Sequence, residues 1–268
     1  MTSSHVNVRD GTRIAYALTM RDPAAPRIVL IHSLGMDRHF WDPVAERLAT
    51  TASILVYDCR GHGQSDKPKG PYTVEQSADD LADLMDHVGW RSAIIAGASM
   101  GGCITLAFAA TYPQRALALG LIDTTAWYDA PKAWEERAQR ALHEGLGAMI
   151  EFQTTRWFTD GFRAAHPEAT KRATATFLAN EPAAYAETCR MLGACNVTAA
   201  LPHLKMPAVI VVGAEDYATP VAMAEALHRG ITGSTLRVVP NARHLTPLEI
   251  PERIATEIAD LTETVAVR

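Results

Sequence analysis

Short runs of aliphatic and β-branched residues alternate along this chain with longer segments in which apolar residues recur every three or four positions. The short aliphatic runs are typical of buried strands, and the recurrence every three or four positions is typical of amphipathic helices. Eight strands are expected, at residues 6–9, 13–18, 28–32, 53–58, 92–98, 116–123, 208–214 and 235–240. Helices are expected at residues 40–49, 73–87, 99–112, 220–229 and 247–261. The alternation predicts an α/β fold with a mostly parallel eight-stranded sheet and helices on both faces.

Two local signals mark boundaries within this pattern. Asp10-Gly11 lies between the first two strands and supplies the positive φ angles of a tight turn, so these strands are expected to form a hairpin. Thr73 and Gln76 fit a capping box, because the threonine hydroxyl and the glutamine side chain can satisfy N–H groups in the first turn of a helix.

The alternation stops between residues 124 and 204. Over this stretch one helical segment follows another, separated by proline and glycine, and no strand pattern is present. We interpret residues 124–204 as a helical cap inserted into an α/β core that consists of residues 1–123 and 205–268. The length of the chain, 268 residues, fits one α/β unit with such an insertion.

The sharpest chemical signal is the sequence from Gly97 to Gly101, Gly-Ala-Ser-Met-Gly, at the point where a buried strand turns into a helix. It fits the G-x-S-x-G pattern, in which a serine is held on a strained turn and side chains at the glycines would collide with neighbouring backbone. The N-terminus of the following helix presents free N–H groups and partial positive charge there. We expect Ser99 to be a nucleophile; a serine that only caps the helix is the alternative.

A serine nucleophile needs a base and an acid that orients the base. His244 lies between the last strand and the last helix, and Asp216 follows the penultimate strand at the edge where sites of α/β sheets are built. Serine, acid and histidine then occur in the chain order of this architecture. Asp123 also ends a strand at this edge and is the rival acid, although it has an alternative role in capping Thr124 and Thr125.

The turn that follows the strand at residues 28–32 is the expected source of an oxyanion donor. It reads His32-Ser33-Leu34-Gly35, and this architecture places a backbone N–H group there that faces the nucleophile. The second donor is the residue after the nucleophile. We therefore expect the backbone N–H groups of Leu34 and Met100 to form the oxyanion hole.

With these motifs in order, the chain resembles the α/β-hydrolase family over essentially its whole length. The family pattern Asp-x-Arg-Gly-x-Gly-x-Ser is present at residues 58–65, where the resemblance implies a structural role. Within the family the chain looks most like the 3-oxoadipate enol-lactonases. The stretches that carry this resemblance are residues 32–41, 70–76, 156–162 and 185–189.

The cap is expected to decide which substrate fits. Trp157 lies in the stretch with the most specific resemblance, so we expect it to line an apolar pocket above Ser99 rather than only pack the cap onto the core. The run from Cys189 to Asn196 lacks charged residues that the lactonases have. A substrate with a free carboxylate needs a cationic partner, for which Arg190 or Arg156 would have to serve.

The resemblance implies that Ser99 attacks an ester carbonyl while His244 accepts its proton and Asp216 stabilises the histidine. The expected reaction is hydrolysis of a lactone or carboxylic ester, with 3-oxoadipate enol-lactone in aromatic-compound catabolism as the leading substrate. Another lactone or ester, C–C bond hydrolysis, a cofactor-free perhydrolase, and a non-catalytic small-ligand receptor are the alternatives. No cofactor and no metal are expected.

Composition narrows the expected partners to small molecules. The formal net charge is −5, from 25 Lys and Arg against 30 Asp and Glu, so no positive field is present for a nucleic acid. The apolar runs are far shorter than a membrane span. Four cysteines without metal-type spacing, and an N-terminus without an apolar leader, predict a reduced, soluble, cytoplasmic protein. Association into a homo-oligomer is left open.

Overall fold

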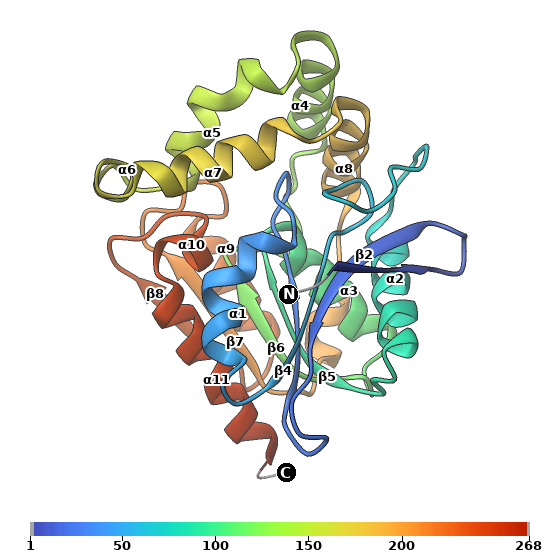
Figure 1. The fold of residues 1–268 in the computed structure, drawn as a ribbon. Helices are drawn as coiled ribbons and strands as arrows, with labels where there is room; N and C mark the ends of the chain where they lie inside the picture. The colour runs from blue at the N-terminus through green and yellow to red at the C-terminus, as the bar shows by residue number, and fades with distance from the viewer. Residues whose placement is uncertain (1–2, 267–268) are drawn as a thin grey trace.

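An eight-stranded sheet forms the centre of the computed structural model, which describes residues 3–266 (Figure 1). The strands are β1 (Ser3–Asn7), β2 (Arg13–Thr19), β3 (Arg27–Ile31), β4 (Ser53–Tyr57), β5 (Ala93–Ala98), β6 (Ala116–Ile122), β7 (Ala208–Gly213) and β8 (Thr235–Val239). Their order across the sheet is β1-β2-β4-β3-β5-β6-β7-β8. The pairs β1–β2 and β2–β4 are antiparallel and the other five are parallel. The predicted mostly parallel sheet is confirmed.

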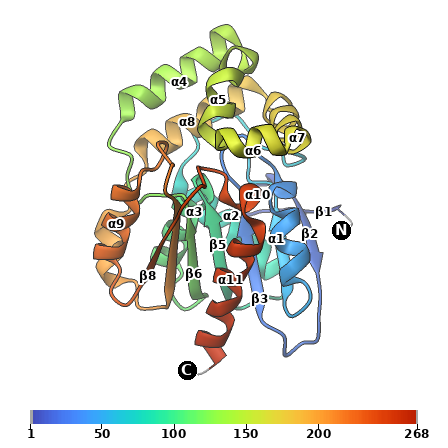
Figure 2. The same ribbon diagram turned by 90° about the vertical axis from the view of Figure 1, so that its left-hand side faces the viewer.

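Helices cover both faces of the sheet (Figure 2). These are η1 (Arg38–Trp41), α1 (Asp42–Leu48), α2 (Val74–His87), α3 (Met100–Thr111), α9 (Val221–Gly230), α10 (Thr246–Glu249) and α11 (Pro251–Ala266). Helix α1 packs on α11, and α2 packs on α3. Strands β3 to β7 are almost wholly buried between them, which explains their uninterrupted apolar sequences.

The helices between β6 and β7 gather at one end of the sheet, as both views show (Figures 1 and 2), except the last of them, which contacts α3 and α9. They are α4 (Pro131–Glu144), η2 (Leu146–Met149), α5 (Ile150–Trp157), α6 (Asp160–Ala165), α7 (Pro167–Leu178), α8 (Pro182–Ala194) and η3 (Thr198–His203). A single bridge joins Trp127 to Asn196, so the two ends of this segment lie together. The fold thus has the expected helical cap, whereas its limits at residues 124 and 204 stay a prediction.

Two elements differ from the sequence expectation. The N-terminal hairpin forms, but its first strand is Ser3–Asn7 rather than 6–9, because the connection is longer than a tight turn. Val8 donates to the carbonyl of Thr12 (2.9 Å), Asp10 accepts from the N–H of Thr12 (3.0 Å), and Gly11 has φ 85°.

The expected last helix at residues 247–261 is in fact two helices, α10 and α11. The break falls at Ile250, which has φ −138°, and Pro251 begins the second helix. Proline has no N–H to continue the first helix, but it is well suited to the first position of the next one.

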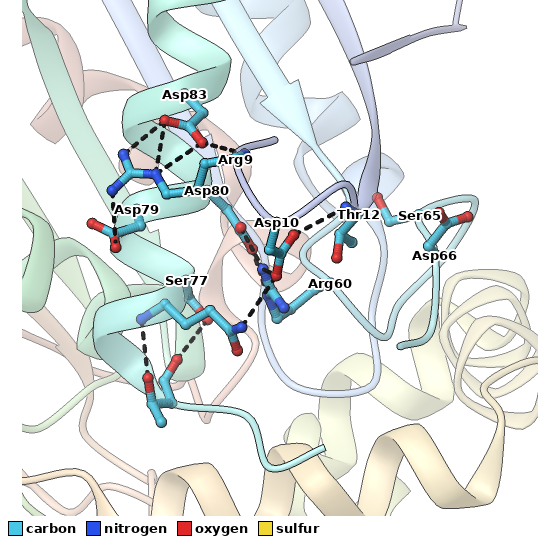
Figure 3. Close-up of polar contacts among 12 residues, drawn as sticks. Arg9, Asp10, Thr12, Arg60, Ser65, Asp66, Ser77, Asp79, Asp80 and Asp83 are labelled. Carbon is cyan, nitrogen blue, oxygen red and sulfur yellow. Dashed lines mark hydrogen bonds and ion pairs between the residues drawn. The ribbon is translucent and has the colours of Figure 1, made fainter. Parts of the chain in front are cut away.

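A polar cluster ties the loop after β4 to the hairpin and to α2 (Figure 3). Arg60 makes two hydrogen bonds of 2.6 Å to Asp80 and one of 3.0 Å to Asp10. Thr73 caps α2 by accepting from the N–H of Gln76 (3.0 Å), as predicted. The Gln76 side chain, however, donates to Asp10 of the hairpin (3.2 Å) and does not bond back to Thr73. Only the threonine half of the predicted capping box is therefore formed.

Other residues of the 58–65 stretch fix this loop internally and join it to η1. Asp58 is fully buried and accepts from Arg38 Nη1 (2.5 Å) and from the backbone N–H groups of Arg38 and Gln64. A Cβ atom on Gly63 would lie 2.4 Å from the Asp58 carboxylate. These contacts agree with a structural role for this stretch.

Candidate active site

Ser99 occupies the turn between β5 and α3 in a conformation that side chains rarely adopt, with φ 54° and ψ −114°. The flanking glycines make this turn possible. A Cβ atom on Gly97 would lie 2.1 Å from the carbonyl oxygen of Gly101, and one on Gly101 would lie 2.1 Å from that of Ile31. The turn therefore holds the Ser99 side chain at the carboxyl edge of the sheet, at the N-terminus of α3.

The structure brings Ser99, His244 and Asp216 together from three separate parts of the chain. His244 lies between β8 and α10, and Asp216 follows β7. His244 Nε2 is 3.0 Å from Ser99 Oγ, and His244 Nδ1 is 2.8 Å from Asp216 Oδ2. The three side chains are buried or nearly so. An imidazole with one nitrogen on a carboxylate and the other on a hydroxyl can accept the hydroxyl proton.

Donors from the loop after β7 hold Asp216 in place. The backbone N–H groups of Ala218 and Thr219 donate to Oδ1 (2.7 and 2.9 Å), and the Thr219 hydroxyl donates to Oδ2 (2.7 Å). Burial by itself would raise the pKa of Asp216, but His244 and these donors lower it below its usual value. Sequence reasoning missed Thr219, although a threonine three residues after an aspartate is a common partner of its carboxylate.

Asp123, the rival acid, has a different set of partners. It accepts from the N–H of Gly213 (3.1 Å), from the N–H of Thr246 (3.2 Å) and from the Thr246 hydroxyl (2.6 Å). The suggested capping of Thr124 and Thr125 is therefore wrong: Asp123 joins the end of β7 to the start of α10. Burial, and then the charge of Asp216, raise its pKa well above the usual value.

The two expected oxyanion donors are free to bind a ligand. Within residues 3–266, neither the N–H of Leu34 nor that of Met100 donates to another protein group. The peptide that carries the Leu34 N–H is fixed from its other side. The carbonyl oxygen of Ser33 accepts from His32 Nδ1 (2.8 Å) and from the N–H of Met36 (3.1 Å).

Two buried histidines support this turn. His32 Nε2 accepts from the N–H of Cys59 (3.0 Å), and His62 Nε2 accepts from the N–H of Gly35 (3.2 Å). Burial lowers the pKa of both rings, that of His62 to about 3. Both are therefore neutral at pH 7, each donating through Nδ1, to the carbonyl oxygens of Ser33 and Arg60 respectively.

Trp157 contacts the loop that carries His244 through its backbone. Its carbonyl oxygen accepts from the N–H groups of His244 (3.1 Å) and Leu245 (3.0 Å). The ring is buried and packs edge-on against Phe177, which in turn contacts Gly35 next to Leu34. The structure thus places Trp157 beside the candidate site, and its contact with a substrate stays a prediction.

Further polar contacts join the end of α5 in the cap to the loop that carries His244 in the core. Arg243 donates to the carbonyl oxygens of Thr155 (2.6 Å) and Phe158 (3.0 Å) at the end of α5. Glu249 accepts from the N–H and hydroxyl of Thr159 (2.8 and 2.5 Å) and from the N–H of Arg243 (2.7 Å). The residue directly before His244 is therefore fixed to the cap, a connection for which the sequence has no local signal.

The two arginines suggested as partners for an anionic substrate differ in their surroundings. Arg190 is bound to Glu135 (2.9 Å) and Glu187 (2.6 Å), so its charge is already neutralised. Arg156, on α5, forms no ion pair with residues 3–266. It lies next to Trp157, and the structure therefore leaves Arg156 as the available one of the two.

Two tyrosines that sequence reasoning missed lie close to the site. Tyr128 is buried, and burial raises its pKa well above the usual value. Tyr185 is fully buried and packs edge-on against Phe177. Neither tyrosine carries a local sequence signal for the site, because Tyr128 lies in the connection before α4 and Tyr185 lies on α8.

Over the described range, 3–266, no group of three or more His, Cys, Asp or Glu side chains is arranged to hold a metal ion. Nor does any helix in that range combine the length and apolarity that crossing a bilayer requires.

Known proteins share this architecture and sequence. Residues 26–251 match the protein family described as alpha/beta hydrolase fold. The 3-oxoadipate enol-lactonase 2 of Acinetobacter baylyi is 31% identical over 227 residues, 85% of this chain and 85% of that protein. The crystal structure of the enol-lactonase from Burkholderia xenovorans has a TM-score of 0.93 and 32% identity, and covers 97% of this chain and 100% of that chain. A thermophilic esterase from Thermogutta terrifontis, with malate bound, has a TM-score of 0.92 and 30% identity, and covers 99% of each chain.

Proposed function

The chain belongs to the α/β-hydrolase family, and from this premise we propose that it hydrolyses a carboxylic ester or lactone through an acyl-enzyme on Ser99. The observation that carries the proposal is the hydrogen-bonded series from Ser99 Oγ through the His244 ring to Asp216. A serine that only caps a helix would need neither a buried imidazole on its hydroxyl nor a strained backbone.

In the first step Ser99 Oγ attacks the carbonyl carbon as its proton passes to His244 Nε2. Asp216 keeps the other ring nitrogen protonated and stabilises the imidazolium that forms. The C–O bond of the ester then breaks, and His244 returns the proton to the leaving oxygen. In a lactone this oxygen stays attached to the acyl group, so the first step opens the ring on the enzyme.

The negative charge on the carbonyl oxygen requires donors that are in place before the reaction. We assign this role to the backbone N–H groups of Leu34 and Met100, which are free and are held by His32 and by the helix start, respectively. A donor of this kind typically contributes about 2.7–4 kcal/mol to stabilising the transition state. Because backbone groups form the hole, side-chain substitutions test it only indirectly.

In the second step a water molecule, activated by His244 Nε2, attacks the acyl-enzyme. The tetrahedral intermediate again places its negative charge at the Leu34 and Met100 amides. Collapse of this intermediate releases the carboxylic acid and restores the Ser99 hydroxyl. Both steps use the same three side chains, and neither needs a metal or an organic cofactor.

For the substrate we propose 3-oxoadipate enol-lactone, which would place the enzyme in the breakdown of aromatic compounds. The support is that relatives named as enol-lactonases match 85% or more of this chain at 31–32% identity. A different lactone or an open carboxylic ester is the alternative, because the cap run from Cys189 to Asn196 differs from that resemblance.

A substrate screen tests this proposal. The expected result is that kcat/KM for the enol-lactone exceeds that for neutral lactones and short p-nitrophenyl esters, and that all turnover requires Ser99. A higher kcat/KM for another lactone or ester would retain the chemistry and change the substrate. No turnover of any ester or lactone by the folded wild-type protein would contradict the proposal and favour a ligand receptor.

A further inference from the structure

A single hydrogen bond joins the end of α7 in the cap to the turn at residues 33–36, which carries the Leu34 amide. Asn180 lies between α7 and α8, and its Nδ2 donates to the carbonyl oxygen of Gly35 (2.8 Å). Both residues are buried, so little water competes for this contact. In the part of the chain that the structure describes, no other hydrogen bond joins residues 167–180 to the core.

Open grooves lie on both sides of this contact. One of about 470 Å³ lies between residues 169–176 of α7 and the segment formed by η1 and the start of α1. A second, of about 210 Å³, lies between the end of α7 and the loop of Gly63, and Asn180 lines it. Met36, the last residue of the turn, lines both grooves. The cap therefore reaches the turn over a narrow area, where few other contacts can replace the hydrogen bond.

This turn contains three peptide groups, and one side chain holds each of them. His32 Nδ1 donates to the carbonyl oxygen of Ser33 (2.8 Å), and His62 Nε2 accepts from the N–H of Gly35 (3.2 Å). Asn180 holds the third peptide through the Gly35 carbonyl oxygen. The two histidines belong to the core, whereas Asn180 belongs to the cap.

Hydrogen bonds connect the Asn180 contact to the oxyanion donor in series. The peptide that accepts from Asn180 donates its own N–H, that of Met36, to the carbonyl oxygen of Ser33 (3.1 Å). The peptide of that carbonyl group carries the Leu34 N–H at its other end. Hydrogen bonds in such a chain polarise one another, so a peptide whose carbonyl accepts a bond becomes a stronger donor through its N–H. Asn180 thus acts on the Leu34 N–H through two peptide groups.

Gly35 is the residue at which this turn could most easily change. Its φ is 75°, and without a side chain it can rotate into other conformations at little cost. The rings of Phe177 and Tyr185 pack where its side chain would lie, because a Cβ atom there would be 2.7 Å from Phe177 Cδ2 and 3.4 Å from Tyr185 Cε2. Ring packing fixes the place of the residue, whereas a hydrogen bond fixes the direction of its carbonyl group.

We propose that Asn180 is a positioning residue for the catalytic step: from the cap, it fixes and polarises the Leu34 donor of the oxyanion hole. The inference rests on the proposed function and on the role of Leu34 given there. The charge on the carbonyl oxygen develops in the transition state, so a better donor lowers the barrier more than it strengthens substrate binding. The cap then takes part in the chemistry as well as in the choice of substrate.

The alternative is that Asn180 only caps the end of α7. Its Nδ2 also donates to the carbonyl oxygens of Thr176 and Phe177 (both 3.0 Å), and such contacts satisfy carbonyl groups at the end of a helix. This role explains two of the three contacts and leaves out the shortest one, to Gly35. Capping predicts a change in stability, whereas positioning predicts a change in kcat.

Two variants of Asn180 separate these roles, with p-nitrophenyl butyrate as the substrate. Asn180→Ala removes both the donor and its volume, whereas Asn180→Leu removes the donor and fills the space. We expect both variants to lower kcat about five- to fiftyfold with KM changed less than about threefold, because the Leu34 N–H is weakened but stays present; loss of a whole donor costs about 10²–10³-fold. Thermal unfolding shows that each variant is folded.

Thr188→Val is the matched control. Thr188 is buried on α8 of the same cap, and its hydroxyl donates to the carbonyl oxygen of Ala184 (3.0 Å) rather than to the turn. The variant removes one buried hydrogen bond of the cap, so we expect a lower melting temperature and a kcat within about twofold of the wild type.

A transition-state analogue measures the oxyanion hole itself. A trifluoromethyl ketone with a butyl chain adds to the enzyme when Ser99 Oγ bonds to its carbonyl carbon, the hydroxyl proton passes to His244 Nε2, and the ketone oxygen takes the negative charge. The corresponding trifluoromethyl alcohol has the same size and cannot form this adduct. In each Asn180 variant we expect Ki of the ketone to rise by about the factor by which kcat/KM falls, and Ki of the alcohol to change less than about twofold.

Wild-type kcat and ketone affinity in the folded Asn180 variants, or an equal loss of kcat in Thr188→Val, would overturn the positioning role and leave ester hydrolysis established. A loss in Asn180→Ala that Asn180→Leu does not share would assign the effect to packing and overturn it as well, as would equal rises of Ki for ketone and alcohol. Failure of the wild type to hydrolyse the ester would instead contradict the proposed function.

Discussion

Two buried aspartates lie at the same edge of the sheet, and their hydrogen bonds distinguish them. Asp216 bonds to the His244 ring, whereas Asp123 bonds to Gly213 and Thr246 and does not bond to that ring. Asp216→Asn would remove the acceptor that keeps His244 in the reactive tautomer. We expect it to lower kcat by about 10⁴-fold, by analogy with other triads.

Asp123→Asn serves as the matched comparison. An amide would place N–H groups against donors of Gly213 or Thr246, so we expect a loss of about 1–3 kcal/mol in the free energy of unfolding, with kcat lowered far less than in Asp216→Asn. Urea unfolding and ester hydrolysis measure the two effects. The reverse order of kcat would make Asp123 the acid.

The buried His62 makes stability depend on pH. Its pKa is about 3 in the folded protein, against about 6.5 in an unfolded chain. Between these values the unfolded state binds a proton that the folded state does not, so acidification favours unfolding. The expected cost approaches about 1.4 kcal/mol per pH unit below pH 6.

Urea unfolding between pH 7 and pH 5 measures this dependence. His62→Gln removes the titrating ring but retains a side chain that can accept a hydrogen bond from Gly35. We expect the variant to be less stable at pH 7 and to lose less stability on acidification than the wild type. Parallel losses in the two proteins would show that His62 does not titrate in this range.

The site residues that follow strands of the sheet could be predicted from the sequence. Residues whose contacts depend on the packing of distant segments could not. Ser99 directly follows β5, Asp216 lies three residues after the end of β7, and His244 lies five residues after the end of β8. Because parallel strands end at one edge, their meeting follows from the pattern. Tyr185 gave no such signal, because its position beside Gly35 depends on how the cap packs on the core. The partners of Asp123 were likewise set by tertiary contacts rather than by its neighbours in the chain.

At the scale of elements, the end of α5 and the start of α10 are joined around His244. Glu249 binds Thr159 of the cap and the N–H of Arg243. Glu249→Gln keeps the shape but removes the charge and one of the two accepting oxygens, so a hydrogen bond to Thr159 or to Arg243 is lost; such bonds are worth about 1.5–3 kcal/mol each when charged. We expect a lower melting temperature and a kcat reduced about three- to tenfold, because the loop of His244 loses its support.

Glu263→Gln, an exposed position on α11, is the control and should change neither quantity. If Glu249→Gln lowers the melting temperature but leaves kcat and its pH profile unchanged, the junction is structural only.

The ends of helices also depend on contacts that the sequence pattern does not show. The last helix was predicted as one segment, and it divides at Pro251 because helical periodicity continues across the break whereas the hydrogen bonds do not.

For the whole molecule, the sheet and the cap have different tasks. The alternation of strands and helices was enough to predict the sheet, since strands buried on both faces must be apolar throughout. The cap was predicted as an insertion, but the contacts of its helices with the core were not. These contacts place Trp157 and Tyr185 beside the loops that carry His244 and Leu34, so the cap contains groups that we expect to select the substrate.

The central claim is that Ser99 forms an acyl-enzyme. Intact-protein mass spectrometry after a brief reaction with a slowly hydrolysed p-nitrophenyl ester tests it most directly. We expect one acyl group per chain, on the peptide that contains Ser99, together with a burst of p-nitrophenol. The folded Ser99→Ala variant should show neither the adduct nor turnover above a trace. An adduct on another residue, or substantial turnover by Ser99→Ala, would contradict the account.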